Sequence, residues 1–148
     1  DVIKELAEDE SAFRSLTLSW FKHSPLYEMM KKMSENSCKV FLTTDHGTIR
    51  VKNASKVMGP KQINSNMRYK VSKNLSYNKK DVMEVLNPEK ISLPKNALSS
   101  SYVFAKENNF FVYPNNYHHF ANLYNDTFQH GGISLEEMLI PYVFLKSK

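Results

Sequence analysis

The sequence has 148 residues, of which 41% are hydrophobic and 12% aromatic, which is enough to bury the core of about one ordinary domain. Its net charge is +5, its apolar runs are short, and Cys38 is its only cysteine. These features exclude a membrane-spanning helix, which needs roughly 20 consecutive apolar residues, and an internal disulfide framework. They favour a cytoplasmic protein without a membrane partner.

Helices are predicted at the start of the sequence. Val2, Ile3 and Leu6 are typical of the end of a helix that begins further upstream, so we expect the sequence to be the C-terminal portion of a longer domain. A second helix, capped by Asp9 or Ser11, carries apolar residues at helical spacing: Phe13, Leu16, Trp20 and Phe21. A third begins with Ser24-Pro25 and has an apolar stripe of Leu26, Met29, Met30 and Met33. Trp20 and the methionines are expected in the core.

Residues 38–44 form a short apolar run without alternation, which predicts a central strand covered on both faces. A helix followed by a buried strand is half of a parallel crossover unit, so the predicted fold class is α/β. After Gly47, Ile49 and Val51 alternate with basic residues, as in a strand with one wet face. Residues 1–52 are thus expected to hold helices, the buried strand and the loop that follows it.

Residues 53–100 are rich in Asn, Lys and Ser and are predicted to be a basic, loop-rich insertion with one small helix and an edge strand at residues 67–71. The stretch from residue 48 to residue 80 has no acidic residue and nine basic ones: Arg50, Lys52, Lys56, Lys61, Arg68, Lys70, Lys73, Lys79 and Lys80. Either this is an ordinary solvated surface, or it attracts a phosphate-bearing ligand.

Residues 101–148 are predicted to contain a β-hairpin, a glycine loop and a last strand. The hairpin joins residues 102–105 and 110–113. A helix is expected at residues 117–124, and Ser134 with Glu137 forms a capping box that opens a helix of about one turn. Residues 142–145 return as a strand.

Two loops carry residues suited to chemistry. Asp45, His46 and Gly47 follow the first strand, and ligands in open α/β sheets lie at the carboxyl ends of strands. His130 precedes two glycines and the capped helix, whose N-terminus favours negative charge. Carboxylate and imidazole groups are zinc ligands, but each loop taken alone is more often a simple turn. If the loops converge, they supply an Asp and two His to one metal site.

The two loops and their flanking residues resemble the PglZ domain of the alkaline-phosphatase superfamily. The similarity is closest to the effector domain of PorX-type response regulators, which are linked to type IX secretion. It extends over essentially the whole chain and is carried by residues 10–14, 45–51, 66–70, 113–117 and 127–141. The long motif around His130 is the most specific of these segments.

The resemblance implies that residues 1–148 are the C-terminal part of a three-layer α/β/α sandwich with a mixed, mainly parallel sheet and an antiparallel hairpin. It implies two Zn²⁺ ions in the intact domain, one bound by Asp45 and His46 and the other by His130. The family's nucleophile and its Asp-x-x-x-His ligand pair are expected upstream, so no catalytic residue is assigned here and the isolated chain is expected to be inactive.

The implied function is a zinc-dependent phosphodiesterase or phosphatase that acts on a nucleotide or oligonucleotide phosphoester. Arg68 and Lys70 are the candidates for binding substrate phosphates. The implied setting is a two-component response regulator with an upstream receiver domain, forming a homodimer in the intact protein. The alternative is a regulatory module without catalysis, which contacts DNA or a sigma factor through its basic segment; such binding would weaken steeply with salt.

Overall fold

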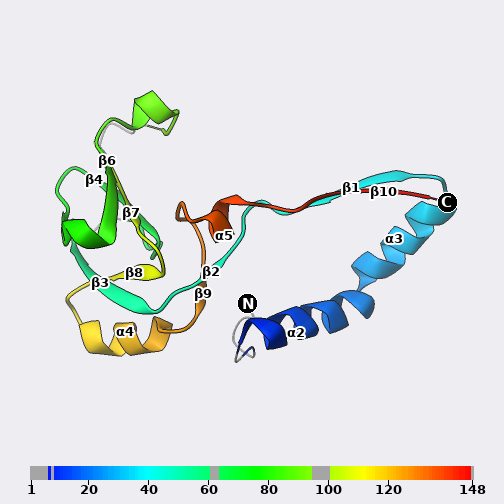
Figure 1. The fold of residues 1–148 in the computed structure, drawn as a ribbon, viewed down its shortest axis with the longest axis horizontal. Helices are drawn as coiled ribbons and strands as arrows, with labels where there is room; N and C mark the ends of the chain where they lie inside the picture. Colours follow the sequence, from blue (N-terminus) through cyan, green and yellow to red (C-terminus); the bar gives the residue numbers. More distant parts are fainter. Residues whose placement is uncertain (1–6, 8, 61–63, 95–100, 148) are drawn as a thin grey trace. The chain divides into compact units, whose positions relative to one another are not determined.

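The computed structural model describes residues 7, 9–60, 64–94 and 101–147, which form two compact units. Unit 1 consists of Asp1–Asp45 and Ile140–Lys148, and unit 2 consists of His46–Leu139. Helices and several small sheets occur together (Figure 1), so the predicted α/β class is confirmed at this level. The helix end predicted at residues 2–6 lies outside the described residues.

The two helices of unit 1 begin at their predicted caps. In α2 (Glu10–Lys22), the Asp9 carboxylate accepts a hydrogen bond of 2.7 Å from the backbone N–H of Ala12. In α3 (Pro25–Glu35), Ser24 is the cap and proline fills the first turn. Neither helix has a fully buried residue, and Trp20 is 56% exposed and Met29 46% exposed. The prediction that these two side chains lie in the core is therefore wrong for this unit.

The strand that follows the helices is not the central strand that its apolar sequence predicts. β1 (Lys39–Thr43) pairs antiparallel with β10 (Tyr142–Lys146), with Phe41 opposite Phe144 and their rings stacked at 4.5 Å (Figure 1). Phe41 is nevertheless 58% exposed. An apolar run indicates that both faces of a strand can be buried, but burial occurs only where other elements pack against those faces.

Unit 2 contains two three-stranded sheets. In the first, β3 (Asn53–Met58) lies between β5 (Ser76–Tyr77) and β8 (Asn109–Val112). In the second, β7 (Ser101–Ala105) lies between β4 (Tyr69–Ser72) and β6 (Val82–Val85). Only the β3–β8 pairing is parallel among the described residues, so the mainly parallel sheet is not found in this part of the chain.

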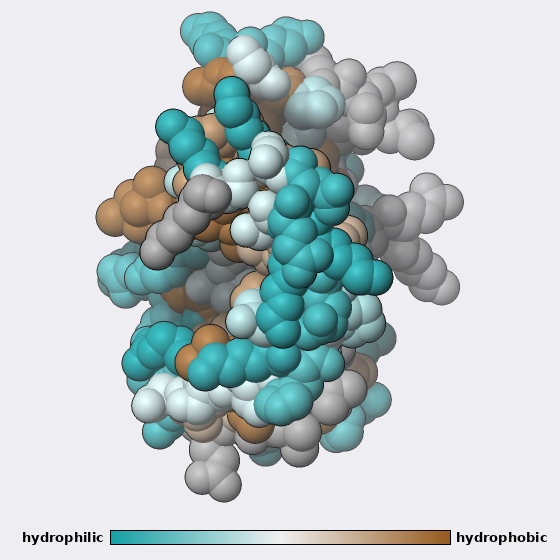
Figure 2. Space-filling model, turned by 90° about the vertical axis from the view of Figure 1, so that its right-hand side faces the viewer, coloured by the Kyte–Doolittle hydropathy of each residue, from teal (hydrophilic) through white to brown (hydrophobic). Residues whose placement is uncertain are grey.

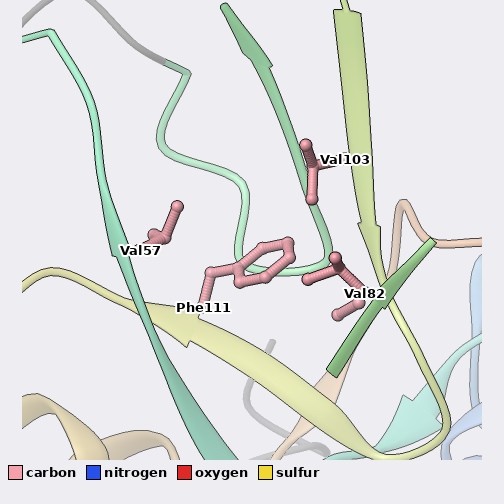
Figure 3. Close-up of a cluster of buried hydrophobic side chains, with 5 residues drawn as sticks. Val57, Val82, Val103 and Phe111 are labelled. Atoms are coloured by element: carbon pink, nitrogen blue, oxygen red, sulfur yellow. The ribbon is translucent and has the colours of Figure 1, made fainter. Parts of the chain in front are cut away.

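The core of unit 2 is built on β7 and β8, which are buried on both faces. Phe111 of β8 and Val103 of β7 pack with Val57 and Val82 (Figure 3). Successive side chains of a strand point to opposite faces, so Phe110 and Val112 pack on the other face of β8. They contact residues in and just after β2 (Ile49–Arg50) and residues of α4 (Tyr117–Tyr124): Ile49, Val51, Tyr117, Phe120 and Tyr124. The neighbours of Val103 pack in a third cluster that includes Val85, Tyr102 and Phe104.

The predicted hairpin of residues 102–105 and 110–113 is wrong, although both of its strands exist. The backbone of Met67 and Arg68 lies between them: the Arg68 carbonyl accepts from Ala105 N–H and the Met67 carbonyl accepts from Phe111 N–H, each at 2.8 Å. The two strands therefore enter different sheets. A short connection permits a hairpin, but the buried apolar faces on both strands favour partners on both sides.

Residues 53–100 contain more regular structure than the predicted loops. β4 lies at an edge of its sheet, close to the edge strand expected at residues 67–71. β3, β5 and β6 replace predicted loops and the small helix, and the only helical pieces described are the short 3₁₀ turns η1 (Lys79–Asp81) and η2 (Pro88–Ile91). The polar composition concealed these strands because each has few buried residues: β3 buries only Ser55 and Val57, β6 only Val82 and Val85, and neither residue of β5 is fully buried.

The remaining predicted elements are present. α4 covers the predicted residues, and α5 (Leu135–Met138) is the one-turn helix with its capping box. On the face shown in Figure 2, hydrophilic residues predominate and hydrophobic residues form separate patches. Among the described helices, none has the length and apolar character required to cross a membrane.

Candidate metal-binding site

A short antiparallel ladder in unit 2 brings His46 and Gly47 of the first candidate loop close to the second candidate loop. β2 (Ile49–Arg50) follows the first loop and β9 (Phe128–Gln129) precedes the second, with Ile49 opposite Gln129. The Arg50 guanidinium lies 2.8 Å from the Asp126 carboxylate and reinforces the pairing. Because the strands run in opposite directions, the residues before Ile49 and those after Gln129 emerge at the same end of the ladder.

His46 and His130 meet at that end. Their imidazole rings stack with centroids 3.8 Å apart and planes 9° from parallel. Asp45 is the last residue of unit 1 and is joined to His46 by one peptide bond. The structure therefore brings together the two predicted histidines from distant parts of the sequence.

The tautomer of His46 is set by its own loop. Nδ1 lies 2.8 Å from the Gly47 carbonyl oxygen, which can only accept a hydrogen bond, so Nδ1 carries the proton in the neutral ring. The lone pair is then on Nε2. Histidines that bind metals commonly have this arrangement, in which a backbone carbonyl orients the ring and fixes the nitrogen that faces the ion.

Glu137 connects the two loops. Its carboxylate accepts hydrogen bonds from Gly132 N–H at 2.9 Å and Ser134 N–H at 3.2 Å, which fixes the loop after His130. Its backbone carbonyl accepts from Gly47 N–H at 2.9 Å, which fixes the loop that carries His46. One residue of a one-turn helix thus holds the backbone on both sides of the paired imidazoles.

Arg68 is the partner of Glu137. Its side chain is fully buried, and Nε and Nη2 each donate to a different carboxylate oxygen at 2.9 Å, while Nη1 donates to the Asn109 carbonyl. Burial by itself would raise the pKa of Glu137, but the hydrogen bonds and charge of Arg68, with the N–H groups of Gly132 and Ser134, hold it below its usual range. The sequence suggested that Arg68 binds a substrate phosphate. In the structure its guanidinium instead supports the two loops through Glu137.

Close backbone approach explains the glycines of the loops. Gly131 has a φ of 100°, in the region that favours glycine, and a Cβ there would collide with the side chain of Asn66. That side chain donates from Nδ2 to the His130 carbonyl at 3.1 Å and accepts from Arg68 N–H at 2.7 Å. At Gly47 a Cβ would meet the backbone carbonyl of Glu136.

Lys70, the second predicted phosphate-binding residue, is also buried. Its ammonium donates to the Asn64 carbonyl at 2.7 Å and lies 5.0 Å from the centroid of the Tyr113 ring. Burial lowers the pKa of Lys70 to about 8. The structure thus places Arg68 and Lys70 inside unit 2, and neither belongs to an exposed cationic surface.

One Asp-x-x-x-His spacing does occur in this chain, from Asp126 to His130. The resemblance places the family's Asp-x-x-x-His ligand pair upstream, and a premise of that assignment, that residues 1–148 contain no such spacing, is wrong. Asp126 precedes β9, and its carboxylate pairs with Arg50. In the structure it belongs to the ladder that carries His130.

The described residues offer a partial set of metal ligands. Across residues 7, 9–60, 64–94 and 101–147, no three His, Cys, Asp or Glu side chains gather closely enough to hold an ion. Catalytic zinc takes about three protein ligands and keeps a further position open. The paired imidazoles fit zinc in chemical type, and a complete site requires additional ligands.

Comparison with models of protein families shows which family the chain belongs to. The family model of the BREX system PglZ alkaline phosphatase-like domain matches residues 3–145. The chain belongs to the PglZ family. A search of curated proteins gives no match. The match spans both units of this PglZ domain and includes both candidate loops, and its description indicates a phosphoesterase-like fold.

Sequence reasoning missed the supporting residues of this PglZ domain. Glu137 was interpreted only as part of a capping box, and Asn66 only as part of a matching segment. The signal for Glu137 is an acidic residue five positions after Gly132, whose buried N–H needs an acceptor. No comparable signal identifies Asn66.

Proposed function

We propose that this PglZ domain contributes metal ligands to a zinc-dependent phosphodiesterase or phosphatase. The observation that carries the proposal is the stacking of His46 and His130, which two separately anchored loops bring together. Two convergent imidazoles, one with its tautomer set by a carbonyl, are typical of a metal-binding site.

In this proposal, His46 binds zinc through Nε2 with Asp45 as its carboxylate neighbour, and His130 binds a second zinc. When bound, the two ions would supply Lewis-acid stabilisation of the attacking and leaving oxygens of a phosphoester. The residues of the chain orient and hold the imidazoles: Glu137 fixes both loops, and Arg68 keeps the Glu137 carboxylate in place.

The remaining parts of the proposed site follow from the family resemblance. The nucleophile and further ligands come from sequence upstream of these residues, within a three-layer α/β/α sandwich. We propose a nucleotide or oligonucleotide phosphoester as substrate, and a two-component response regulator of the PorX type, with its receiver domain and a homodimeric assembly, as the setting.

The proposal is tested by measuring zinc in the complete protein. Replacement of His46 or His130 by alanine is expected to lower the zinc content, because each removes one ligand. His118→Ala is the matched control, since His118 is an exposed histidine on α4. Full zinc content in both the His46→Ala and the His130→Ala proteins would show that the metal assignment is wrong.

The alternative, a binding module for DNA or a sigma factor, is not favoured by the structure. Arg68 and Lys70 are buried and Arg50 pairs with Asp126, so these three cations are not displayed to a partner. Of the acid-free stretch, the exposed lysines among the described residues are Lys52, Lys56, Lys73, Lys79 and Lys80. Phosphate-mediated binding through them would weaken steeply with salt, whereas chelators would abolish zinc-dependent hydrolysis.

A further inference from the structure

A second concave site lies in unit 2, beside β8 and α4. It is a cavity of about 210 Å³, lined mainly by Met67, Lys70, Phe111, Tyr113, Phe120 and Tyr124. An apolar cavity of about 150 Å³ is large enough to bind benzene. The site therefore has room for one small ring and a substituent, with aromatic and aliphatic side chains along most of its wall.

Lys70 places a buried cation in this wall. The side chain is 1% exposed, and of its three ammonium hydrogens the structure assigns one, to the Asn64 carbonyl. No carboxylate of the described residues pairs with it, and burial alone accounts for its perturbed pKa. A buried ammonium without an anion is costly, so an anionic group that enters the cavity would relieve this cost.

Tyr113 adds an unused hydrogen-bonding group to the same wall. Its hydroxyl oxygen is buried and has no hydrogen-bond partner in the structure. Its ring lies 5.0 Å from the Lys70 ammonium, which places the two residues next to each other. Buried hydroxyls are nearly always satisfied, so a ligand in the cavity that accepts a hydrogen bond from this hydroxyl would complete its hydrogen bonding.

We propose that this cavity binds a small aromatic carboxylate, with its carboxylate at Lys70 and Tyr113 and its ring against Met67, Phe120 and Tyr124. A single negative charge matches the Lys70 ammonium, which has no carboxylate partner among the described residues. Inorganic phosphate carries more charge and more hydration than one ammonium, one hydroxyl and apolar walls can replace. The flat apolar walls select the ring. This site does not depend on zinc or on the His46–His130 pair.

The experiment measures benzoate binding to the complete protein by isothermal titration calorimetry. Benzamide and inorganic phosphate are the comparison ligands. Benzoate is expected to bind at one site, and the other two ligands at least about tenfold more weakly. Lys70→Met is expected to weaken benzoate binding by at least about tenfold, because it removes the cation. The variant keeps a side chain of similar length. Lys73→Met, which changes an exposed lysine just after β4, is the control and should bind normally.

Tyr113→Phe removes only the hydroxyl, so the proposal can still be tested if Lys70→Met does not fold. This variant is expected to weaken benzoate binding by about threefold or more. The proposal is overturned if benzoate shows no saturable binding up to roughly 10 mM, if benzamide or phosphate binds as tightly, or if both cavity variants bind like the unchanged protein. Zinc content measured on the same samples reports on the metal site separately.

Discussion

At the scale of single residues, the described part of unit 2 contains three buried charged side chains, Arg68, Lys70 and Glu137, and they differ in whether they have a counter-ion. Glu137 and Arg68 form a bidentate buried pair, so their charges compensate each other. Lys70 has a carbonyl and an aromatic ring as neighbours, but no counter-ion among the described residues. A buried pair stabilises loops, whereas an unpaired buried cation is more typical of a binding site.

Lys70 gives a prediction on pH and stability. Burial lowers its pKa from 10.5 to about 8, so the folded protein binds this proton less tightly than the unfolded chain. Below pH 8 the buried ammonium opposes folding. Between pH 8 and pH 10.5 the folded state loses the proton while the unfolded chain keeps it, and the free energy of unfolding rises.

The measurement compares urea unfolding of the unchanged protein and Lys70→Met at pH 7 and pH 10.5. The variant is expected to be the more stable at pH 7, by up to about 3 kcal/mol, and this advantage should shrink as the pH rises. Effects of other titrating groups cancel in the difference. An advantage that is independent of pH would show that the pKa of Lys70 is not lowered by burial.

At the scale of elements, the site depends on α5 and on the β2–β9 ladder. Glu137→Leu leaves the buried Arg68 guanidinium without its counter-ion and removes the acceptor for Gly132 and Ser134 N–H. We expect a loss of about 3–5 kcal/mol in the free energy of unfolding. Arg68→Met should cost a similar amount for the same reason, since it leaves the carboxylate unpaired.

The double variant Arg68→Met/Glu137→Leu removes both charges. Its loss in the free energy of unfolding is expected to be clearly smaller than the sum of the losses of the two single variants. A double-mutant cycle from denaturant unfolding measures this coupling. Additive losses would mean that the two side chains do not act as a pair.

Local sequence predicted the elements better than their partners. The caps Asp9, Ser24 and Ser134 mark helix starts, because a side-chain oxygen must satisfy N–H groups that the helix leaves open. β7 and β8 were located correctly, but their pairing was not, since strand pairing depends on distant residues such as Met67. In the site, His46 and His130 lie in sequence motifs that identify them as candidate ligands. The Arg68–Glu137 pair has no such motif, and composition does not show that these two residues are buried together.

At the scale of the whole molecule, the two units differ in how much apolar surface they bury. Unit 2 has three clusters of buried hydrophobic residues, while Trp20 and Phe41 of unit 1 remain largely exposed. The sequence could not predict this difference, because an apolar stripe shows which face can be buried but not what covers it. The PglZ family match extends over both units.

The central claim is that His46 and His130 bind zinc, and anomalous X-ray diffraction at the zinc edge from crystals of the complete protein tests it most directly. The account predicts anomalous density about 2.0–2.1 Å from Nε2 of His46, with zinc also bound by His130. Anomalous density that lies only at other residues, or none from crystals grown with zinc, would contradict the account.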